Sequence, residues 1–262
     1  MIIREEYLQQ LISWKDEQVI KVVTGIRRCG KSTLLKQFQE YLRQNGTEPE
    51  QIVSVNFEDL EFEDLLDYKA LYSYIRERLC SGRKTYIFLD EIQKVSSFEK
   101  VVGSLYIQEN TDIYITGSNA YMLSGDLATF LTGRYVEISM LPFSFKEYAE
   151  ITGIPREQAF ADYMKNGGLP YVAVMDRTDE KVDAYLEGTY NTVIIKDIED
   201  RQSRRERDPE KRKITDIVLL KTIARFLAGV IGSPVSIRSV TDYLISSGRK
   251  VSPNTVDDYV EA

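Results

Sequence analysis

The sequence predicts an α/β fold in which a parallel sheet comes first and a helical region follows. Short runs rich in β-branched residues recur through the first half of the chain, and helical runs separate most of them. Alternation of strand and helix is typical of a parallel sheet that helices cover on both faces. The strand-like runs stop after about residue 142. The predicted strands are Val19–Thr24, Ile52–Phe57, Thr85–Asp90, Asp112–Thr116 and Tyr135–Met140.

Helical periodicity in the first half predicts elements that pack on this sheet. Residues 3–14 have the spacing of a short amphipathic helix. The segment Lys31–Arg43 has apolar residues at positions 34, 35, 38 and 42, which form one helix face, and Gly46 lies just past its end. We therefore expect a helix to begin soon after the first strand.

The middle of the chain is predicted to be helical, with a break at Gly167–Pro170. A dense charge run, residues 196–213, has eight basic and six acidic residues. Because the signs are mixed, we interpret this run as a solvated helix face or a linker rather than a basic arm. The predicted helices are Ser144–Ile151, Pro155–Lys165 and Glu180–Asp200.

The last part of the chain resembles the helical part of a winged-helix domain without its wing. Its last helix has an apolar stripe but ends without a cap, and so short a helix is marginal alone. We therefore expect that the chain is truncated and that more protein follows. The predicted helices run from Pro209 to Phe226 or beyond, from a Ser236 cap to near Gly248, and from a Ser252 cap with Pro253 in the first turn. The predicted domains are residues 1–150, a helical lid or connector over 151–205, and a helical bundle over 206–262.

Composition excludes several classes of chemistry. The chain has no histidine, so a Ser-His-Asp or Cys-His nucleophile and a histidine-ligated metal are excluded. Two cysteines cannot build a disulfide framework or a four-cysteine zinc site. The net charge of −7 gives no general basic surface for nucleic acid. No apolar run is long enough for a membrane span and no signal peptide is recognisable, so we expect a cytoplasmic protein.

The segment Gly25–Ser32 matches the P-loop pattern G-x-x-x-x-G-K-[ST]. In this pattern backbone N–H groups form an anion nest, Lys31 reaches the β- and γ-phosphates, and the Ser32 hydroxyl holds Mg²⁺. The pattern also follows a predicted strand and opens a predicted helix, which is the context that a P-loop requires. The residues predicted to bind the nucleotide are Gly25, Ile26, Arg27, Arg28, Cys29, Gly30, Lys31, Ser32 and Thr33.

Cys29 inside this loop has two interpretations. It is a small residue that fits, or it is a thiol whose pKa is lowered by the helix N-terminus and Lys31. The second interpretation predicts that thiol alkylation blocks nucleotide binding and that ATP protects.

Two carboxylates, Asp90 and Glu91, end the apolar run that begins at Tyr86. Buried carboxylates are unfavourable unless they face a positive group. With the P-loop, this is the Walker B arrangement, in which Asp90 holds Mg²⁺ and Glu91 polarises the attacking water. The alternative is an acidic cap on the following helix.

The neighbouring glutamate of the Walker B pair resembles that of the AAA+ ATPases. The segment Ile115–Asn119 is similar to the sensor-1 strand of that superfamily, in which a polar residue contacts the γ-phosphate or the attacking water. By this resemblance Asn119 or Ser118 has that role, and Asn119 is assigned as catalytic together with Lys31 and Glu91.

A narrower resemblance is to a prokaryotic family of AAA+-type ATPases whose members carry a C-terminal domain of unknown function, nuclease-like in some. It implies that Arg134 stabilises charge on the γ-phosphate, from its own or a neighbouring subunit, or else forms a structural salt bridge. The motifs that carry the resemblance, in order, are Gly25–Ser32, Leu89–Gln93, Thr116–Ser118, Gly133–Tyr135, Pro142–Tyr148 and Gly167–Pro170.

The predicted function is therefore Mg²⁺-dependent ATP binding and hydrolysis that drives a conformational change. A nucleotide-controlled switch with slow turnover and a DNA-associated or defence ATPase are the alternatives, and a small-molecule kinase is disfavoured because no arginine-rich lid is evident. The predicted partners are nucleotide, further copies of the chain and the absent C-terminal domain. DNA is a weaker prediction, because the last helix carries Asp257, Asp258 and Glu261.

Overall fold

The computed structural model describes residues 2–117, 131, 133–176, 178–205 and 216–260, and for residues 194–205 it describes the backbone alone. The chain divides into two compact units, Met1–Asp183 and Ala184–Ala262. The predicted division at residues 150 and 205 stays a prediction.

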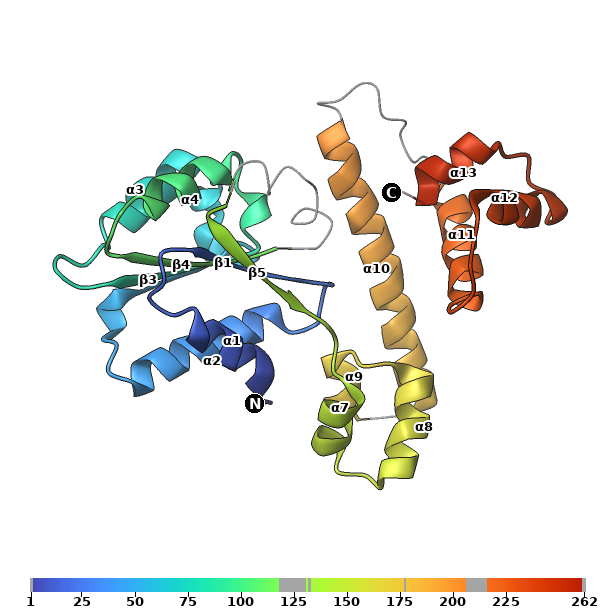
Figure 1. Ribbon diagram of the computed structural model, residues 1–262, viewed down its shortest axis with the longest axis horizontal. Helices are drawn as coiled ribbons and strands as arrows, with labels where there is room; N and C mark the ends of the chain where they lie inside the picture. The colour runs from blue at the N-terminus through green and yellow to red at the C-terminus, as the bar shows by residue number, and fades with distance from the viewer. Residues whose placement is uncertain (1, 118–130, 132, 177, 206–215, 261–262) are drawn as a thin grey trace. The chain divides into compact units, whose positions relative to one another are not determined.

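The first unit is built on a parallel sheet with the strand order β2-β3-β4-β1-β5 (Figure 1). The α/β parallel-sheet prediction is confirmed, and each predicted strand limit lies within one residue of the observed one. The strands are β1 (Ile20–Gly25), β2 (Ile52–Asn56), β3 (Thr85–Asp90), β4 (Thr111–Thr116) and β5 (Tyr135–Met140).

Helices cover both faces of this sheet, as Figure 1 shows. Val22 of β1 belongs to the core that includes residues of α3 and α4, and its neighbour Val23 belongs to the core beneath α1 and α2. Successive side chains of a strand point to opposite faces, so a run of apolar residues is buried on both. The covering helices are α1 (Glu5–Ser13), α2 (Lys31–Gln44), α3 (Tyr68–Arg76) and α4 (Phe98–Tyr106), and the 3₁₀ turns are η1 (Pro49–Gln51), η2 (Leu60–Leu66) and η3 (Ile92–Lys94).

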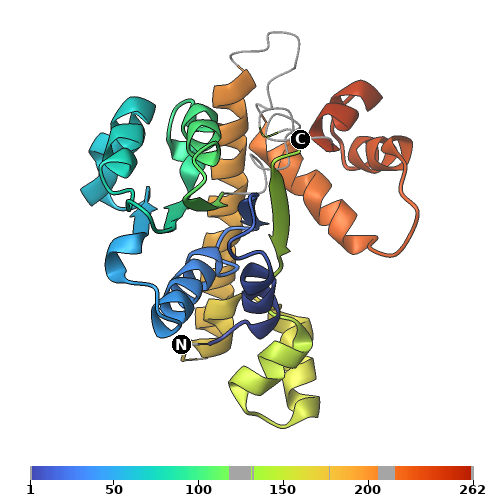
Figure 2. The same ribbon diagram turned by 60° about the vertical axis from the view of Figure 1, so that its left-hand side comes forward.

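Three helices follow the carboxyl end of β5 (Figure 2). They enclose a small core of Phe143, Tyr148 and Ala173, on which Ile2 from the N-terminal segment also packs. Ser144 and Glu147 form a capping box that starts the first of these helices. They are α7 (Phe145–Thr152), α8 (Arg156–Asn166) and α9 (Pro170–Val174), so the predicted break lies between α8 and α9.

The second unit contains a three-helix core formed by α11 (Ile217–Gly229), α12 (Ile237–Ser246) and α13 (Pro253–Val260). The predicted caps Ser236 and Ser252 are confirmed, since each side-chain oxygen accepts from a backbone N–H of its helix. The prediction of one continuous helix from Pro209 is wrong, because α11 begins at Ile217 and is capped by the side chain of Asp216. Pro209 itself lies outside the described residues. The long helix α10 (Asp179–Arg205) precedes this core.

Within the described residues, no helix combines the length and the apolar character that crossing a bilayer would require.

Candidate active site

The P-loop connects β1 to α2 at the carboxyl edge of the sheet. The helix starts at Lys31, and its N-cap, Gly30, has the left-handed φ of 107°. No side chain caps this helix. The first backbone N–H groups of α2 therefore have no side-chain acceptor at the cap, which is the arrangement that binds a phosphate group at a helix N-terminus.

Glycine is required at position 25 because the surrounding protein atoms leave no room for a side chain. Its φ is +149°, and a Cβ atom there would lie 2.3 Å from the carbonyl oxygen of Met140 and 2.8 Å from Cys29 Sγ. Because Met140 ends the adjacent strand β5, a side chain at Gly25 would push the loop away from the sheet.

Lys31 is buried and turned back onto its own loop. Its Nζ donates to the carbonyl oxygens of Gly25, at 3.0 Å, and Ile26, at 3.3 Å. The same Nζ lies 3.8 Å from Glu91 Oε1. One ammonium group thus connects the P-loop with the carboxylates that follow β3.

Asp90 ends β3 and has two hydroxyl partners. Thr116 Oγ1, at the end of the adjacent strand β4, donates to Asp90 Oδ1 at 2.5 Å, and the Ser32 side chain also hydrogen-bonds to Asp90. Burial raises the pKa of Asp90, and the nearby Glu91 charge acts in the same direction, while both hydroxyls and Lys31 lower it. Asp90 is therefore a desolvated carboxylate that a cation would stabilise.

Glu91 is the first residue after β3 and has a left-handed backbone, with φ 58° and ψ 45°. Such a conformation in a residue other than glycine costs about 1–3 kcal/mol and is found at functional sites. Its backbone N–H donates to Thr116 Oγ1 at 2.9 Å. Its Oε2 accepts a 2.5 Å hydrogen bond from Gln93 Nε2. The end of β4 therefore holds the Glu91 backbone, and Gln93 of η3 holds its carboxylate.

Sequence reasoning missed the roles of Thr116 and Gln93. Thr116 was within the segment compared with sensor 1, and a signal was present, because adjacent parallel strands end at the same edge and Thr116 is the last residue of its strand. Gln93 ends the motif Leu89–Gln93 that carries the family resemblance, but a place two residues after Glu91 does not by itself predict a contact.

The interpretation of Cys29 as an activated thiol is wrong. The side chain is fully buried, and burial raises its pKa, although Lys31 and Arg4 act against this effect. The residue instead packs in the core beneath α2.

Arg4 was not predicted and is almost fully buried. Its guanidinium donates to Glu147 through Nε at 2.7 Å and Nη2 at 3.0 Å. It also donates to the carbonyl oxygens of Leu141, at 2.6 Å, and Cys29, at 3.5 Å. One side chain therefore joins the P-loop, the segment after β5 and the start of α7.

Arg134 lies at the amino ends of the strands, whereas the P-loop lies at their carboxyl ends. It precedes β5, and its carbonyl oxygen accepts from Ile20 N, at the start of β1. The edge that holds Gly25 is six residues further along β5, about 20 Å at roughly 3.3 Å per residue. The alternative in which Arg134 acts on the nucleotide of its own subunit does not fit this distance.

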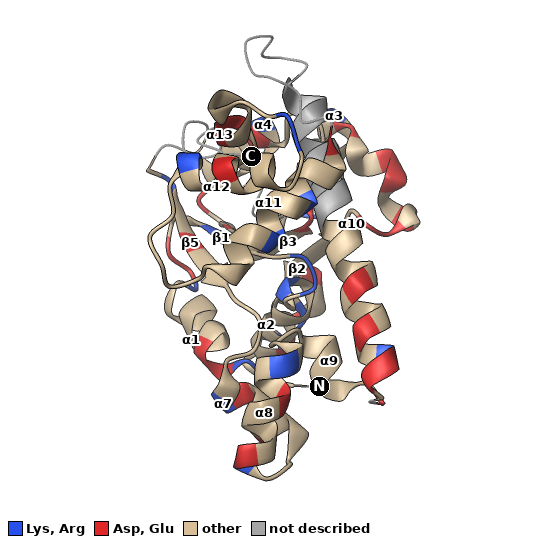
Figure 3. Ribbon diagram, turned by 90° about the vertical axis from the view of Figure 1, so that its right-hand side faces the viewer, with Lys and Arg blue, Asp and Glu red and all other residues tan. Residues whose placement is uncertain are grey.

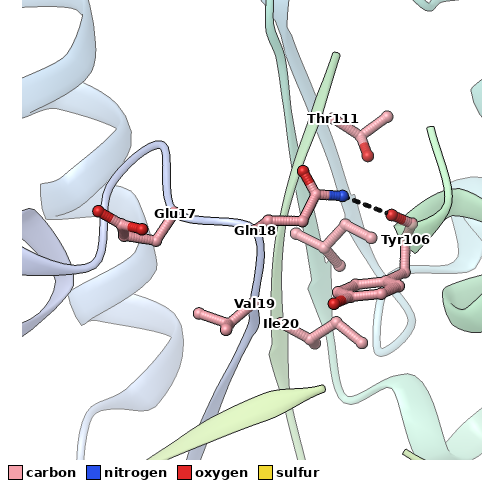
Figure 4. Close-up of a pocket in the computed structure, with 7 residues that line it drawn as sticks. Glu17, Gln18, Val19, Ile20, Tyr106 and Thr111 are labelled. Atoms are coloured by element: carbon pink, nitrogen blue, oxygen red, sulfur yellow. Dashed lines mark hydrogen bonds between the residues drawn. The ribbon is translucent and has the colours of Figure 1, made fainter. Parts of the chain in front are cut away.

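The Arg134 guanidinium lies 5.4 Å from the centre of the Tyr106 ring. Tyr106 lines a small pocket at the amino ends of β1 and β4 (Figure 4). Gln18 Nε2 donates to the Tyr106 carbonyl oxygen there, at 2.8 Å. This pocket is distinct from the P-loop edge and contains none of the predicted ATP-binding residues.

The other predicted site residues have simple positions. Ile26 and Arg28 are exposed on the P-loop and Thr33 on the first turn of α2, while Arg27 is half-buried. Arg28 has a left-handed backbone with φ 65°. Asn119 lies outside the described residues.

The oxygen donors at this edge fit Mg²⁺. This ion prefers carboxylate, hydroxyl and phosphate oxygens. Ser32 supplies a hydroxyl and Asp90 a carboxylate whose pKa is raised by burial, so the pair provides a negative charge that lacks full compensation. The P-loop supplies N–H groups for the phosphates beside it.

Comparison with known proteins identifies the class. Residues 17–149, just over half of the chain, match the family described as an AAA domain, and the chain belongs to this family. The family is one of AAA+-type ATPases. A Walker-type ATPase of Pyrococcus abyssi has a similar fold, with a TM-score of 0.59, 17% identity, and coverage of 100% of this chain and 88% of that one.

Longer relatives are found in both bacteria and archaea. An uncharacterized protein of Haemophilus influenzae is 38% identical over 267 residues, covering 100% of this chain and 64% of the relative. An uncharacterized protein of Methanocaldococcus jannaschii is 26% identical over 258 residues, covering 92% of this chain and 54% of the relative. The chain therefore spans less than two thirds of the length of these relatives.

Proposed function

We propose that the chain binds ATP with Mg²⁺ and hydrolyses it, and that the nucleotide state controls a conformational change. One observation carries this proposal: Lys31 of the P-loop lies 3.8 Å from Glu91, beside Asp90 and Ser32, all at one edge of the sheet. These groups are the parts that phosphoryl transfer to water requires.

In this mechanism the residues position and neutralise rather than react covalently. The N–H groups of the P-loop and Lys31 hold the β- and γ-phosphates and offset their charge. Glu91 accepts a hydrogen bond from water and directs its oxygen at the γ-phosphorus. When bound to Ser32 and Asp90, Mg²⁺ would supply additional positive charge to the phosphate oxygens.

The experiment that tests this function measures ATP binding and phosphate release for the parent chain and two variants. We expect Lys31→Ala to lose binding, and Glu91→Gln to keep binding but lose hydrolysis. Lys36→Ala, which changes an exposed lysine of the same helix, is the matched control. Absence of ATP binding in the parent would contradict the proposal.

A slow nucleotide-controlled switch uses the same pocket, so the rate of turnover separates the two functions. Tight ATP binding with little phosphate release in the parent, and little change in Glu91→Gln, would favour the switch. Hydrolysis that depends on Glu91 would favour the ATPase.

The conformational part of the proposal is supported by Arg4. Its contacts join Cys29 of the P-loop to Leu141 and to Glu147 of α7. A shift of the P-loop backbone on nucleotide binding would therefore act directly on the segment that leads into α7–α9.

Arg134 is proposed to act on the nucleotide of a neighbouring copy. Its exposed position at the edge opposite the P-loop supports this alternative over action on its own nucleotide. Mixing Arg134→Ala with Lys31→Ala tests it, because an assembly of the two would contain neighbours with an intact P-loop beside an intact Arg134. Hydrolysis that is absent in each variant and present in the mixture is expected.

A C-terminal domain beyond this chain, a cytoplasmic location and DNA binding stay predictions. For the last, α13 carries acidic residues (Figure 3), including the exposed Asp257, and negative charge opposes contact with a phosphate backbone. We therefore do not propose DNA as the partner of this helix.

A further inference from the structure

The side chain of Gln93 is a feature of the site that the proposed function leaves unused. Its Nε2 donates to Glu91 Oε2 at 2.5 Å. Its Oε1 is buried and has no hydrogen-bond partner among the residues that the structure describes. A buried polar atom without a partner is rare, and an absent water or ligand is a common reason for one.

The chemistry of the two side chains decides which end of the amide faces Glu91. An ionised carboxylate only accepts hydrogen bonds, so it attracts the NH₂ end of the amide and repels the carbonyl end. The Gln93 carbonyl oxygen is therefore the end left over as an acceptor.

The other partner of Glu91 is one that a nucleotide would compete for. Glu91 Oε1 lies 3.8 Å from Lys31 Nζ, and the lysine of a P-loop binds the β- and γ-phosphates. ATP would therefore draw this ammonium group toward the phosphates. Gln93 would still hold the Glu91 carboxylate, through the opposite oxygen.

We propose that Gln93 is a positioning residue for ATP hydrolysis, an inference that rests on the proposed function. Its Nε2 fixes Oε2 of Glu91, which leaves Oε1 of Glu91 to accept one hydrogen of the attacking water. Its own Oε1 accepts the other hydrogen. A water that donates both of its hydrogens presents a lone pair to the γ-phosphorus.

The step that this arrangement serves is a simple hydrolysis. The water oxygen forms a bond to the γ-phosphorus, and the bond from that phosphorus to the β–γ bridging oxygen breaks. One water proton passes to the Glu91 carboxylate and then to solvent, and ADP and inorganic phosphate leave. Gln93 exchanges no proton, so its effect is confined to the orientation of Glu91 and the water.

The test compares Gln93→Met, which keeps the length of the side chain and removes both hydrogen-bonding ends, with the parent. We expect kcat to fall about 10-fold to 100-fold, part of the 10²–10⁴ that a positioned base contributes. The Kd for ATP and the unfolding temperature are expected to stay unchanged. Gln44→Met is the matched control, since it breaks another Gln–Glu hydrogen bond, at 3.1 Å to Glu40, at the far end of α2.

A double-mutant cycle separates positioning from a structural effect. In a Glu91→Gln background, measured on the residual phosphate release, Gln93→Met should cause a smaller loss than in the parent, because only the water and no longer the base is oriented by Gln93. Gln93→Glu keeps the size and polarity of the side chain but removes the donor, so we expect its kcat to fall at least as far.

Two results would overturn the role of Gln93 while leaving ATP hydrolysis intact. One is a kcat in Gln93→Met equal to that of the parent, and the other is an equal fold-loss of kcat in the parent and Glu91→Gln backgrounds. A parent chain that releases no phosphate would overturn the proposed hydrolysis, and this inference with it. The two failures are therefore distinguishable.

Discussion

At the scale of one residue, Asp90 is a group whose burial suits cation binding but lowers the stability of the fold. Its pKa is raised chiefly by burial, and the hydrogen bonds from Thr116 and Ser32 compensate only in part. The native state therefore binds a proton at Asp90 more tightly than the unfolded state does. The stabilisation that this gives is present below the unfolded pKa and is lost as pH rises through the native pKa, so at neutral pH the ionised group destabilises the fold.

We predict that Asp90→Asn makes the nucleotide-free chain more stable by about 1 kcal/mol at pH 7, because it removes a buried charge. Urea unfolding at pH 7 and at pH 5 measures this, and the gain should be smaller at pH 5, where a raised pKa leaves more Asp90 protonated. The same variant should lose the dependence of ATP binding on Mg²⁺.

Asp64→Asn, a change at an exposed aspartate, is the control for loss of one negative charge. If both variants changed stability equally, burial of Asp90 would not be the cause.

At the scale of elements, the N-terminal segment has a larger role than its length suggests. Arg4 precedes α1, and its guanidinium lies 4.6 Å from the Tyr7 ring centre and 5.0 Å from that of Phe143. With its bonds to Glu147, this side chain ties α1 and α7 to the carboxyl edge of the sheet. The Arg4 interaction also lowers the pKa of Glu147, although burial opposes it.

We predict that Arg4→Met lowers the free energy of unfolding by about 3 kcal/mol, the lower end of the loss for a buried ion pair, because the Glu147 side chain is 24% exposed. Urea unfolding followed by circular dichroism measures the loss. The control is Arg43→Met, which breaks an exposed pair with Glu40 and should change stability by less than about 1 kcal/mol. Similar losses in the two variants would show that the Arg4 pair is not energetically special.

Local sequence patterns predicted the limits of most elements, and they failed where a contact with a distant residue sets the start of a helix. The strands Thr85–Asp90 and Tyr135–Met140 were predicted at their observed limits. The first is an apolar run buried on both faces, and the second is an edge strand that alternates at its end, with Ile138 and Met140 buried and Ser139 exposed. The start of α11 was missed, since Pro209 suits a first helical turn but the cap is Asp216. The Asp216 N–H donates to the hydroxyl of Tyr259 in α13, a contact that spacing along the chain does not reveal.

At the scale of the whole molecule, nucleotide binding is expected to be linked to the stability of only one unit. All of the described P-loop and Walker B residues lie in Met1–Asp183. The chain has one tryptophan, Trp14, which belongs to the same unit, so its fluorescence reports the unfolding of that unit.

We predict that Mg²⁺ and ATP, at 100 times the Kd, stabilise this unit by about 2.7 kcal/mol, because a ligand that binds only the folded state shifts the equilibrium by mass action. Thermal unfolding followed by Trp14 fluorescence measures the shift. Lys31→Ala should abolish it, whereas Lys36→Ala should retain it. An unchanged transition in the parent, under conditions in which binding is measured directly, would show that ATP does not stabilise the unit through the P-loop.

The sequence by itself determined the α/β class, the limits of the strands, and the positions of the P-loop and of the Asp90–Glu91 pair. These features depend on periodicity and on residues that are close along the chain, such as Gly25 and Lys31.

Only the tertiary structure decided which distant side chains meet. It brought Thr116 to Asp90, linked Arg4 to Glu147, and separated Arg134 from the P-loop by the length of a strand. It also raised the pKa of Cys29, which its place beside a helix N-terminus would have lowered. The physical reason is that strand order and burial arise from packing of the whole unit, and they set both the neighbours of a charged group and the water that it loses.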